Sequence, residues 1–125
     1  MTHRILVIDD MSDAADALTR LLGTYGYEGK YVTDPRDAVA TACAFKPAIV
    51  LLDIGMPHIN GYELCPMLRT ALEPSPVRIV AVTAWGSDQD RKRSRAVGFD
   101  AHLVKPTDSA LILATIAELL ESPEH

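Results

Sequence analysis

The feature that most constrains this chain is the apolar run from Ala48 to Leu52, which ends on Asp53. Five apolar residues in a row are too few for a helix of ordinary length, so the run predicts a strand buried on both faces. Gly55 and Pro57 follow closely and predict a loop. When a parallel strand ends on an aspartate, the carboxylate lies in the crevice beyond the sheet, where open α/β folds bind their ligands. A second reading stays open, in which Asp53 only caps the next helix.

Four more strand patterns alternate with helical patterns along the chain. Strands are predicted at about 5–8, 28–33, 77–82 and 101–104, and helices begin near Ser12, Asp34, Asn60, Ser87 and Thr107. Glu63 lies three residues after Asn60, and Asp90 lies three after Ser87, so each pair predicts a capping box. The strict alternation predicts an α/β fold, a doubly wound (βα)5 domain with a five-stranded parallel sheet. In the flavodoxin-like strand order 2-1-3-4-5, strands one and three meet where ligands bind.

The composition predicts one ordinary globular domain. The chain has 125 residues, of which 48% are hydrophobic and 23% charged. We expect a single domain over 1–125, with its core at about 3–121 and no output domain. The formal net charge of −5 argues against nucleic-acid binding. No apolar run is long enough for a signal peptide or a membrane span, so we expect a cytoplasmic protein without membrane contact. Cys43 and Cys65 match no metal-ligand spacing and predict free thiols.

Chemically useful side chains follow four of the five predicted strands. Asp9 and Asp10 come after the first strand, Asp53 after the third, Thr83 after the fourth and Lys105 after the fifth. In the order 2-1-3-4-5 these are the four strands nearest the switch point, so their side chains should share one crevice. The second strand, at the outer edge, delivers no comparable group.

This set of groups suits phosphoryl transfer. Three carboxylates in one crevice repel one another and need a counter-charge, which Mg²⁺ supplies while keeping some water and phosphate ligands. Asp53 can act as a nucleophile and form an aspartyl phosphate. The metal and the Lys105 ammonium would neutralise charge on the transferred oxygens, and the Thr83 hydroxyl can donate a hydrogen bond to them.

The motifs in this order resemble the receiver domain of bacterial two-component response regulators. The residues that carry the resemblance are Asp9-Asp10, Asp53-x-x-x-Pro57, Thr83-Ala84 and Lys105-Pro106. Each motif alone is weak, but the combination is specific and covers about residues 3–120. The resemblance implies a phosphorelay module that takes its phosphoryl group from a phosphohistidine, on a sensor histidine kinase or a histidine phosphotransfer protein. It implies no substrate turnover beyond the domain's own phosphorylation and dephosphorylation.

The resemblance also implies a role for each site residue. Asp53 would be the phosphoacceptor, with Thr83 and Lys105 in contact with the phosphoryl group. The Mg²⁺ ligands would be Asp9, Asp10, Asp53 and the backbone carbonyl of Gly55. The Lys105–Pro106 peptide bond would be cis, as in the family.

Two residues near the crevice carry open alternatives. The family usually has Tyr or Phe three residues before the lysine, as a rotamer switch, and this chain has His102 there. His102 is either a partly exposed side chain with a reduced role, or it swings inward with Thr83 and makes the output pH-sensitive. Trp85 follows Ala84 at the rim of the crevice. It is either a packing residue or a lid that controls water access to the phosphoryl group.

The helix predicted after Ser87 is unusually polar. It carries Arg91, Lys92, Arg93 and Arg95 with almost no apolar stripe, so it should be weakly anchored. A solvated face is the simplest reading. In line with the family, we expect a partner-docking or homodimer surface around this helix, the fifth strand and the fifth helix, with the downstream protein target unknown.

Other classes fit less well. Haloacid-dehalogenase-like phosphatases also use an aspartyl phosphate, but they need Asp-x-Asp and a cap domain, whereas Asp9 and Asp10 are adjacent. A pseudo-receiver would keep the fold without the chemistry, although every reactive position is present here. A dinucleotide-binding domain would need Gly-x-Gly-x-x-Gly after the first strand. A stand-alone regulator and a receiver from a hybrid sensor kinase both fit the sequence.

Overall fold

The computed structural model describes residues 2–121, which include the core expected at about 3–121. The sheet contains β1 (Arg4–Ile8), β2 (Glu28–Val32), β3 (Ile49–Leu52), β4 (Arg78–Thr83) and β5 (Ala101–Val104). The helices are α1 (Ser12–Thr24), α2 (Ala38–Phe45), α3 (Gly61–Leu72), α4 (Asp88–Val97) and α5 (Ser109–Glu121). All strand pairs are parallel, in the order β2-β1-β3-β4-β5. The predicted fold class and strand order are confirmed.

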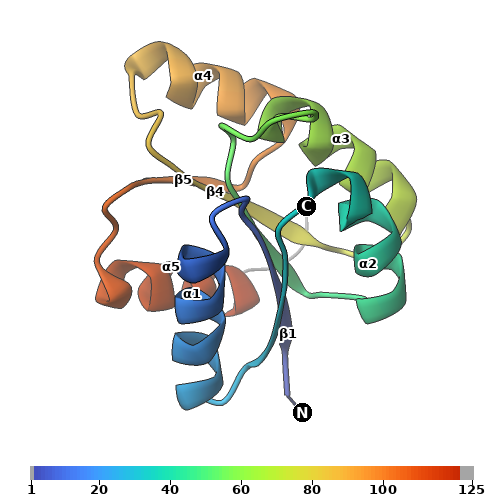
Figure 1. Cartoon of the computed structure of the whole chain (residues 1–125), viewed down its shortest axis with the longest axis vertical. Helices are drawn as coiled ribbons and strands as arrows, with labels where there is room; N and C mark the ends of the chain where they lie inside the picture. The colour runs from blue at the N-terminus through green and yellow to red at the C-terminus, as the bar shows by residue number, and fades with distance from the viewer. Residues whose placement is uncertain (1, 122–125) are drawn as a thin grey trace.

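Helices cover both faces of the sheet (Figure 1). On one face, α1 and α5 pack over a core that includes Ile5, Leu51 and Ile116. On the other face, α2 and α3 pack over a second core that includes Leu52 and Leu68. The two cores exist because successive strand side chains point to opposite faces, and both faces of a parallel sheet are buried.

The central strand has the predicted environment. All four residues of β3 are buried, with exposed fractions of 0–1%. In the register between β1 and β3, Ile8 pairs with Leu52, and the Asp53 amide donates to the Ile8 carbonyl at 2.9 Å. Asp9 and Asp53 therefore leave the sheet side by side, at the same level of its carboxyl edge.

Both predicted capping boxes are present. The Asn60 side chain accepts from the Glu63 amide at 3.0 Å, and the Glu63 carboxylate accepts from the Asn60 amide at 3.3 Å. Ser87 and Asp90 make the same reciprocal pair at 3.0 and 3.2 Å. Each box satisfies amides that have no partner inside the helix, so it fixes where the helix begins. The two boxes begin the helices that follow β3 and β4.

Two helix starts differ from the sequence expectation. The turn after Asp34 is a short 3₁₀ helix, Pro35–Asp37, and α2 begins only at Ala38. Thr107 does not open α5, because its hydroxyl donates back to the Val104 carbonyl at 3.0 Å. Asp108 caps the start of α5 instead, since its carboxylate accepts a hydrogen bond from the Ala110 amide at 2.9 Å. Thr and Asp both cap helices well, so residue type alone does not predict which of two adjacent residues caps the helix.

Candidate functional site

Three carboxylates gather at the carboxyl edge of the sheet. Oxygen atoms of Asp9, Asp10 and Asp53 lie within 4.8 Å of one another, and Asp9 and Asp53 are buried. Backbone amides orient two of them: the Met11 amide donates to Asp9 Oδ1 at 2.9 Å, and the Gly55 amide donates to Asp53 Oδ1 at 3.2 Å. A cluster of oxygen ligands at this spacing suits a hard divalent cation such as Mg²⁺. The donor set therefore fits the metal implied by the sequence.

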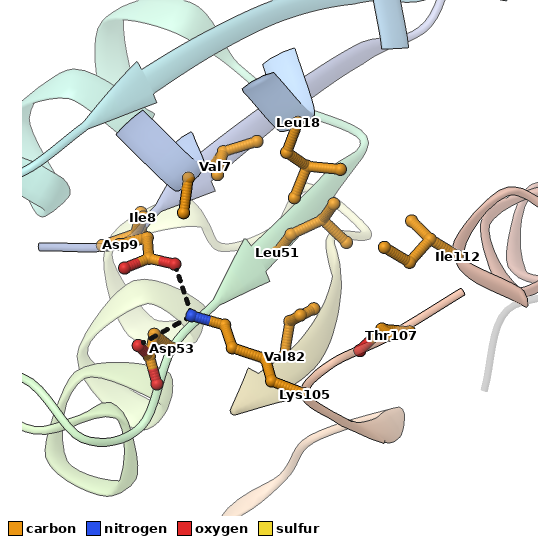
Figure 2. A pocket seen from close by; sticks show the side chains of 11 residues that line it. Val7, Ile8, Asp9, Leu18, Leu51, Asp53, Val82, Lys105, Thr107 and Ile112 are labelled. Carbon is orange, nitrogen blue, oxygen red and sulfur yellow. Dashed lines mark hydrogen bonds and ion pairs between the residues drawn. The ribbon is translucent and has the colours of Figure 1, made fainter. Parts of the chain in front are cut away.

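Lys105 links two of these carboxylates. Its Nζ atom lies 2.7 Å from Asp9 Oδ2 and 3.3 Å from Asp53 Oδ2 (Figure 2). Partial burial alone would lower the pKa of Lys105, but its hydrogen bonds to Asp9 and Asp53 and their charges outweigh burial, and the pKa is raised. The Lys105–Pro106 peptide bond is cis, as expected. The ammonium is thus a fixed positive charge beside Asp53.

Thr83 and Trp85 form the rim beside β4. Thr83 is buried at the end of that strand, and its Oγ1 accepts a hydrogen bond from the Trp85 amide at 3.2 Å. Ala84 between them is exposed. The Trp85 indole lies over Gly55 so closely that a Cβ atom added to Gly55 would be 3.1 Å from indole Cε2. The indole covers the loop that follows Asp53, although 43% of Trp85 stays exposed.

His102 is hydrogen-bonded to the same rim. Its Nε2 atom lies 2.7 Å from the Trp85 carbonyl oxygen. Because a carbonyl oxygen only accepts, Nε2 is the nitrogen that carries the hydrogen. His102 is partly exposed, and its imidazole is hydrogen-bonded to the loop between β4 and α4. No sequence pattern indicates this contact, since both partners are ordinary loop and strand positions.

Two glycines allow close backbone approaches that the sequence analysis did not single out. A Cβ atom on Gly61 would lie 2.7 Å from Ile54 Cα and 2.8 Å from the Asp53 carbonyl oxygen. A Cβ atom on Gly86 would lie 2.6 Å from a methyl group of Val104. The first approach brings the start of α3 against the residue after Asp53. The second brings the β4–α4 loop against β5.

A cavity of about 150 Å³ opens beside the charged groups. Asp9, Asp53 and Lys105 stand at one end of it, and apolar side chains such as Leu18 from α1 and Ile112 from α5 line the rest (Figure 2). The aliphatic part of Lys105 runs along this apolar wall, and its ammonium reaches the acids. This position lets a charged group remain in a largely apolar setting.

Comparison with known protein families decides what this arrangement is. The family of the response regulator receiver domain matches residues 5–117, nearly the whole chain. The chain belongs to this family. It is a receiver domain of two-component response regulators, and the phosphoacceptor role that is standard in the family applies to it. Within residues 2–121, no helix is both long and apolar enough to cross a membrane.

Individual relatives agree with this assignment. The receiver domain is 32% identical over 117 residues to protein PilH of Pseudomonas aeruginosa, covering 94% of this chain and 97% of PilH. It is 34% identical to response regulator MprA of Mycolicibacterium vanbaalenii, covering 96% of this chain but only 51% of MprA. It thus spans about half the length of several curated relatives. A CheY-like receiver domain protein from Methanospirillum hungatei superposes with a TM-score of 0.89 at 27% identity, over 97% of this chain and 95% of that one.

Proposed function

We propose that Asp53 accepts the phosphoryl group, and that the donor is a phosphohistidine on a sensor histidine kinase or a histidine phosphotransfer protein. The observation that carries the proposal is the Lys105 ammonium, which lies 3.3 Å from Asp53 Oδ2 inside a cluster of three carboxylates. Receiver domains as a family are phosphorylated by histidine kinases. Asp53 is the acceptor in this proposal because it is buried and follows directly on the end of β3.

The transfer exchanges one bond for another. An oxygen of the Asp53 carboxylate forms a bond to phosphorus, while the bond from phosphorus to the donor imidazole breaks and its electron pair stays on that nitrogen. Lys105 is placed to donate to an oxygen of the arriving group, and the Thr83 hydroxyl can do so from the β4 side. Asp9, Asp10, Asp53 and the Gly55 carbonyl would hold Mg²⁺, which when bound neutralises charge on the transferred oxygens.

The test is the intact mass of the protein after incubation with Mg²⁺ and acetyl phosphate. We expect one added phosphoryl group in the wild type and in Asp13→Asn, an exposed carboxylate of α1 outside the site. Asp53→Asn should stay unmodified, and chelation of Mg²⁺ should slow the wild type strongly. Phosphorylation of Asp53→Asn at the wild-type rate would refute the assignment. An unmodified wild type, also after incubation with phosphorylated kinases, would favour the pseudo-receiver reading.

We further propose that phosphorylation is read out through the loop between β4 and α4. The Thr83 hydroxyl accepts from the Trp85 amide, and the Trp85 carbonyl accepts from His102. When Thr83 turns its hydroxyl toward a phosphoryl oxygen, the bond to Trp85 weakens, and the change reaches His102 on β5. The output surface would then be α4, β5 and α5, which would bind a protein target or a second copy of the chain.

The weak anchoring of α4 supports this surface. Ser94 is the single residue of α4 that is fully buried, so little apolar burial resists a movement of the helix. We expect phosphorylation to increase amide hydrogen exchange in α4 and to leave α3 nearly unchanged, and His102→Ala to reduce that response. Equal exchange in α3 and α4, before and after phosphorylation, would contradict the proposal. A faster loss of phosphate from Trp85→Ala would support the lid role of that indole, which covers Gly55.

A further inference from the structure

A second cavity, of about 140 Å³, lies between α4 and β5. Its walls include Arg91, Ser94 and Arg95 of α4 and His102 of β5. Because one water occupies about 30 Å³ of liquid, the space holds a few waters or one small anion. The cavity is separate from the acidic cluster, because none of Asp9, Asp10 and Asp53 lines it.

Two buried polar atoms of the lining residues have no hydrogen-bond partner within residues 2–121. One is Oγ of Ser94, a residue with an exposed fraction of 1%, and the other is Nδ1 of His102. Since His102 Nε2 donates to the Trp85 carbonyl, Nδ1 of the neutral ring is an acceptor. Buried polar groups in native proteins are nearly always satisfied, so each exception calls for a missing partner. A single group that accepts from the Ser94 hydroxyl and donates to Nδ1 of the neutral His102 ring would satisfy both atoms.

The charges around the cavity favour an anion as that partner. Arg91 and Arg95 lie one turn apart on the same side of α4, and neither guanidinium forms an ion pair in the described part of the chain. Asp100 also lines the cavity, but its carboxylate is bound by Arg69 at 2.6 Å and by the Ile79 amide at 2.8 Å. The cavity therefore presents two unpaired positive charges in a chain whose formal net charge is −5.

We propose that this cavity binds a phosphate group that retains a proton, with inorganic phosphate as the simplest ligand. The phosphate oxygens accept hydrogen bonds from Arg91, Arg95 and the Ser94 hydroxyl, and the remaining P–OH group donates to Nδ1 of His102. Sulfate has the same shape but carries no proton near neutral pH, so it leaves Nδ1 without a donor. The pattern of donors and acceptors thus selects phosphate over sulfate. Through the bond from His102 to the Trp85 carbonyl, the bound anion would hold the β4–α4 loop in its present position.

The test is a titration of the isotopically labelled protein with phosphate and with sulfate, followed by NMR at constant ionic strength without divalent cations. We expect saturable shifts at Ser94 and His102 with phosphate, and about tenfold weaker binding of sulfate, the change that follows from one lost hydrogen bond. Lys105→Met should keep the same affinity, which separates this cavity from the phosphoacceptor site. Shifts that never saturate, or equal affinity for the two anions, would overturn the proposal.

Variants of α4 supply matched controls. Ser94→Ala should bind phosphate about tenfold more weakly, while its melting temperature without anion rises because an unsatisfied hydroxyl is gone. Arg95→Gln should also bind about tenfold more weakly, as expected for a charge-assisted bond. Lys92→Gln removes the same charge from an exposed position that does not line the cavity, and it should change the affinity by less than about twofold. Equal losses in Arg95→Gln and Lys92→Gln would show general charge attraction and overturn the site.

Discussion

Replacing Gly61 by alanine should destabilise the domain, although alanine is the better helix former. Gly61 is the first residue of α3, and its amide donates to the Ile54 carbonyl at 2.8 Å. An alanine Cβ would lie 2.7 Å from Ile54 Cα and 2.8 Å from the Asp53 carbonyl oxygen. Both neighbours are backbone atoms, so no side-chain rotation relieves the contact. Either α3 or the chain after Asp53 has to move by several tenths of an ångström.

The size of the effect follows from these contacts. Inserting an atom into a packed interior costs about 1–3 kcal/mol, and for a domain of this size each kcal/mol lowers the melting temperature by about 3–6 °C. Gly23 of α1 provides a matched control, because a Cβ atom there meets nothing within 4 Å. Gly23→Ala should therefore stabilise the domain by up to about 1 kcal/mol, through helix propensity alone. The same substitution in two helices is expected to have opposite signs.

Thermal and urea unfolding of the two variants measure this difference, and acetyl phosphate labelling adds a functional readout. Because the strain in Gly61→Ala falls on the backbone of Asp53, phosphorylation should slow by about ten- to a hundredfold, as for a nucleophile displaced by a fraction of an ångström. Gly23→Ala should be phosphorylated at the wild-type rate. If Gly61→Ala is as stable as Gly23→Ala, the close approach of α3 to the Asp53 loop is not a constraint and the reasoning is wrong.

Two further predictions concern titratable groups. The pKa of Lys105 is raised above its ordinary 10.5, so its ion pairs with Asp9 and Asp53 stabilise the fold below that pH and are lost as the pH rises through the raised value. Lys105→Met should lower the free energy of unfolding at pH 8 by about 1–3 kcal/mol. Above pH 10, the free energy of unfolding should fall less steeply in this variant than in the wild type. Urea titrations that give parallel pH profiles for the variant and the wild type would contradict this prediction. Burial raises the pKa of the Cys65 thiol to about 11, whereas Cys43 is exposed, so a thiol reagent at pH 8 should modify one cysteine in the folded protein and both in denaturant. Cys43→Ala should remove the fast reaction, and a fast reaction that survives it would place Cys65 at the surface.

The sequence was sufficient to predict the parts of the fold that depend on local pattern. The buried strand before Asp53 and the capping boxes at Asn60 and Ser87 follow from periodicity and spacing, whereas the strand order was expected from the flavodoxin-like fold class. The structure confirms all three. The predicted cap of α5 was wrong by one residue, because Thr107 and Asp108 are both good caps and tertiary contacts decide between them.

The site could be predicted as a set of residues but not as a geometry. Asp9, Asp10 and Asp53 do lie together, because parallel strands bring their carboxyl ends to one edge. The bond from His102 to the Trp85 carbonyl could not be predicted, since it depends on a side-chain rotamer and a loop path. The unpartnered atoms between α4 and β5 are equally invisible in the sequence, because they depend on how the side chains of these two elements face each other.

Arg69 holds one end of α4 through short hydrogen bonds, whereas the first turn is held by longer ones, at 3.3 Å, from the Tyr62 hydroxyl to Asp90. Its guanidinium donates to the Gly98 carbonyl at 2.6 and 3.0 Å and to the Val77 carbonyl at 2.9 Å, so the residue that ends α4 is tied to α3 and to the start of β4. The opposite end of α4 follows the loop that carries Trp85. We expect a displacement that starts in this loop to break these longer bonds first and to turn α4 about Gly98. The largest movement would then occur at the first turn of α4, far from the pivot and next to the site that triggers it.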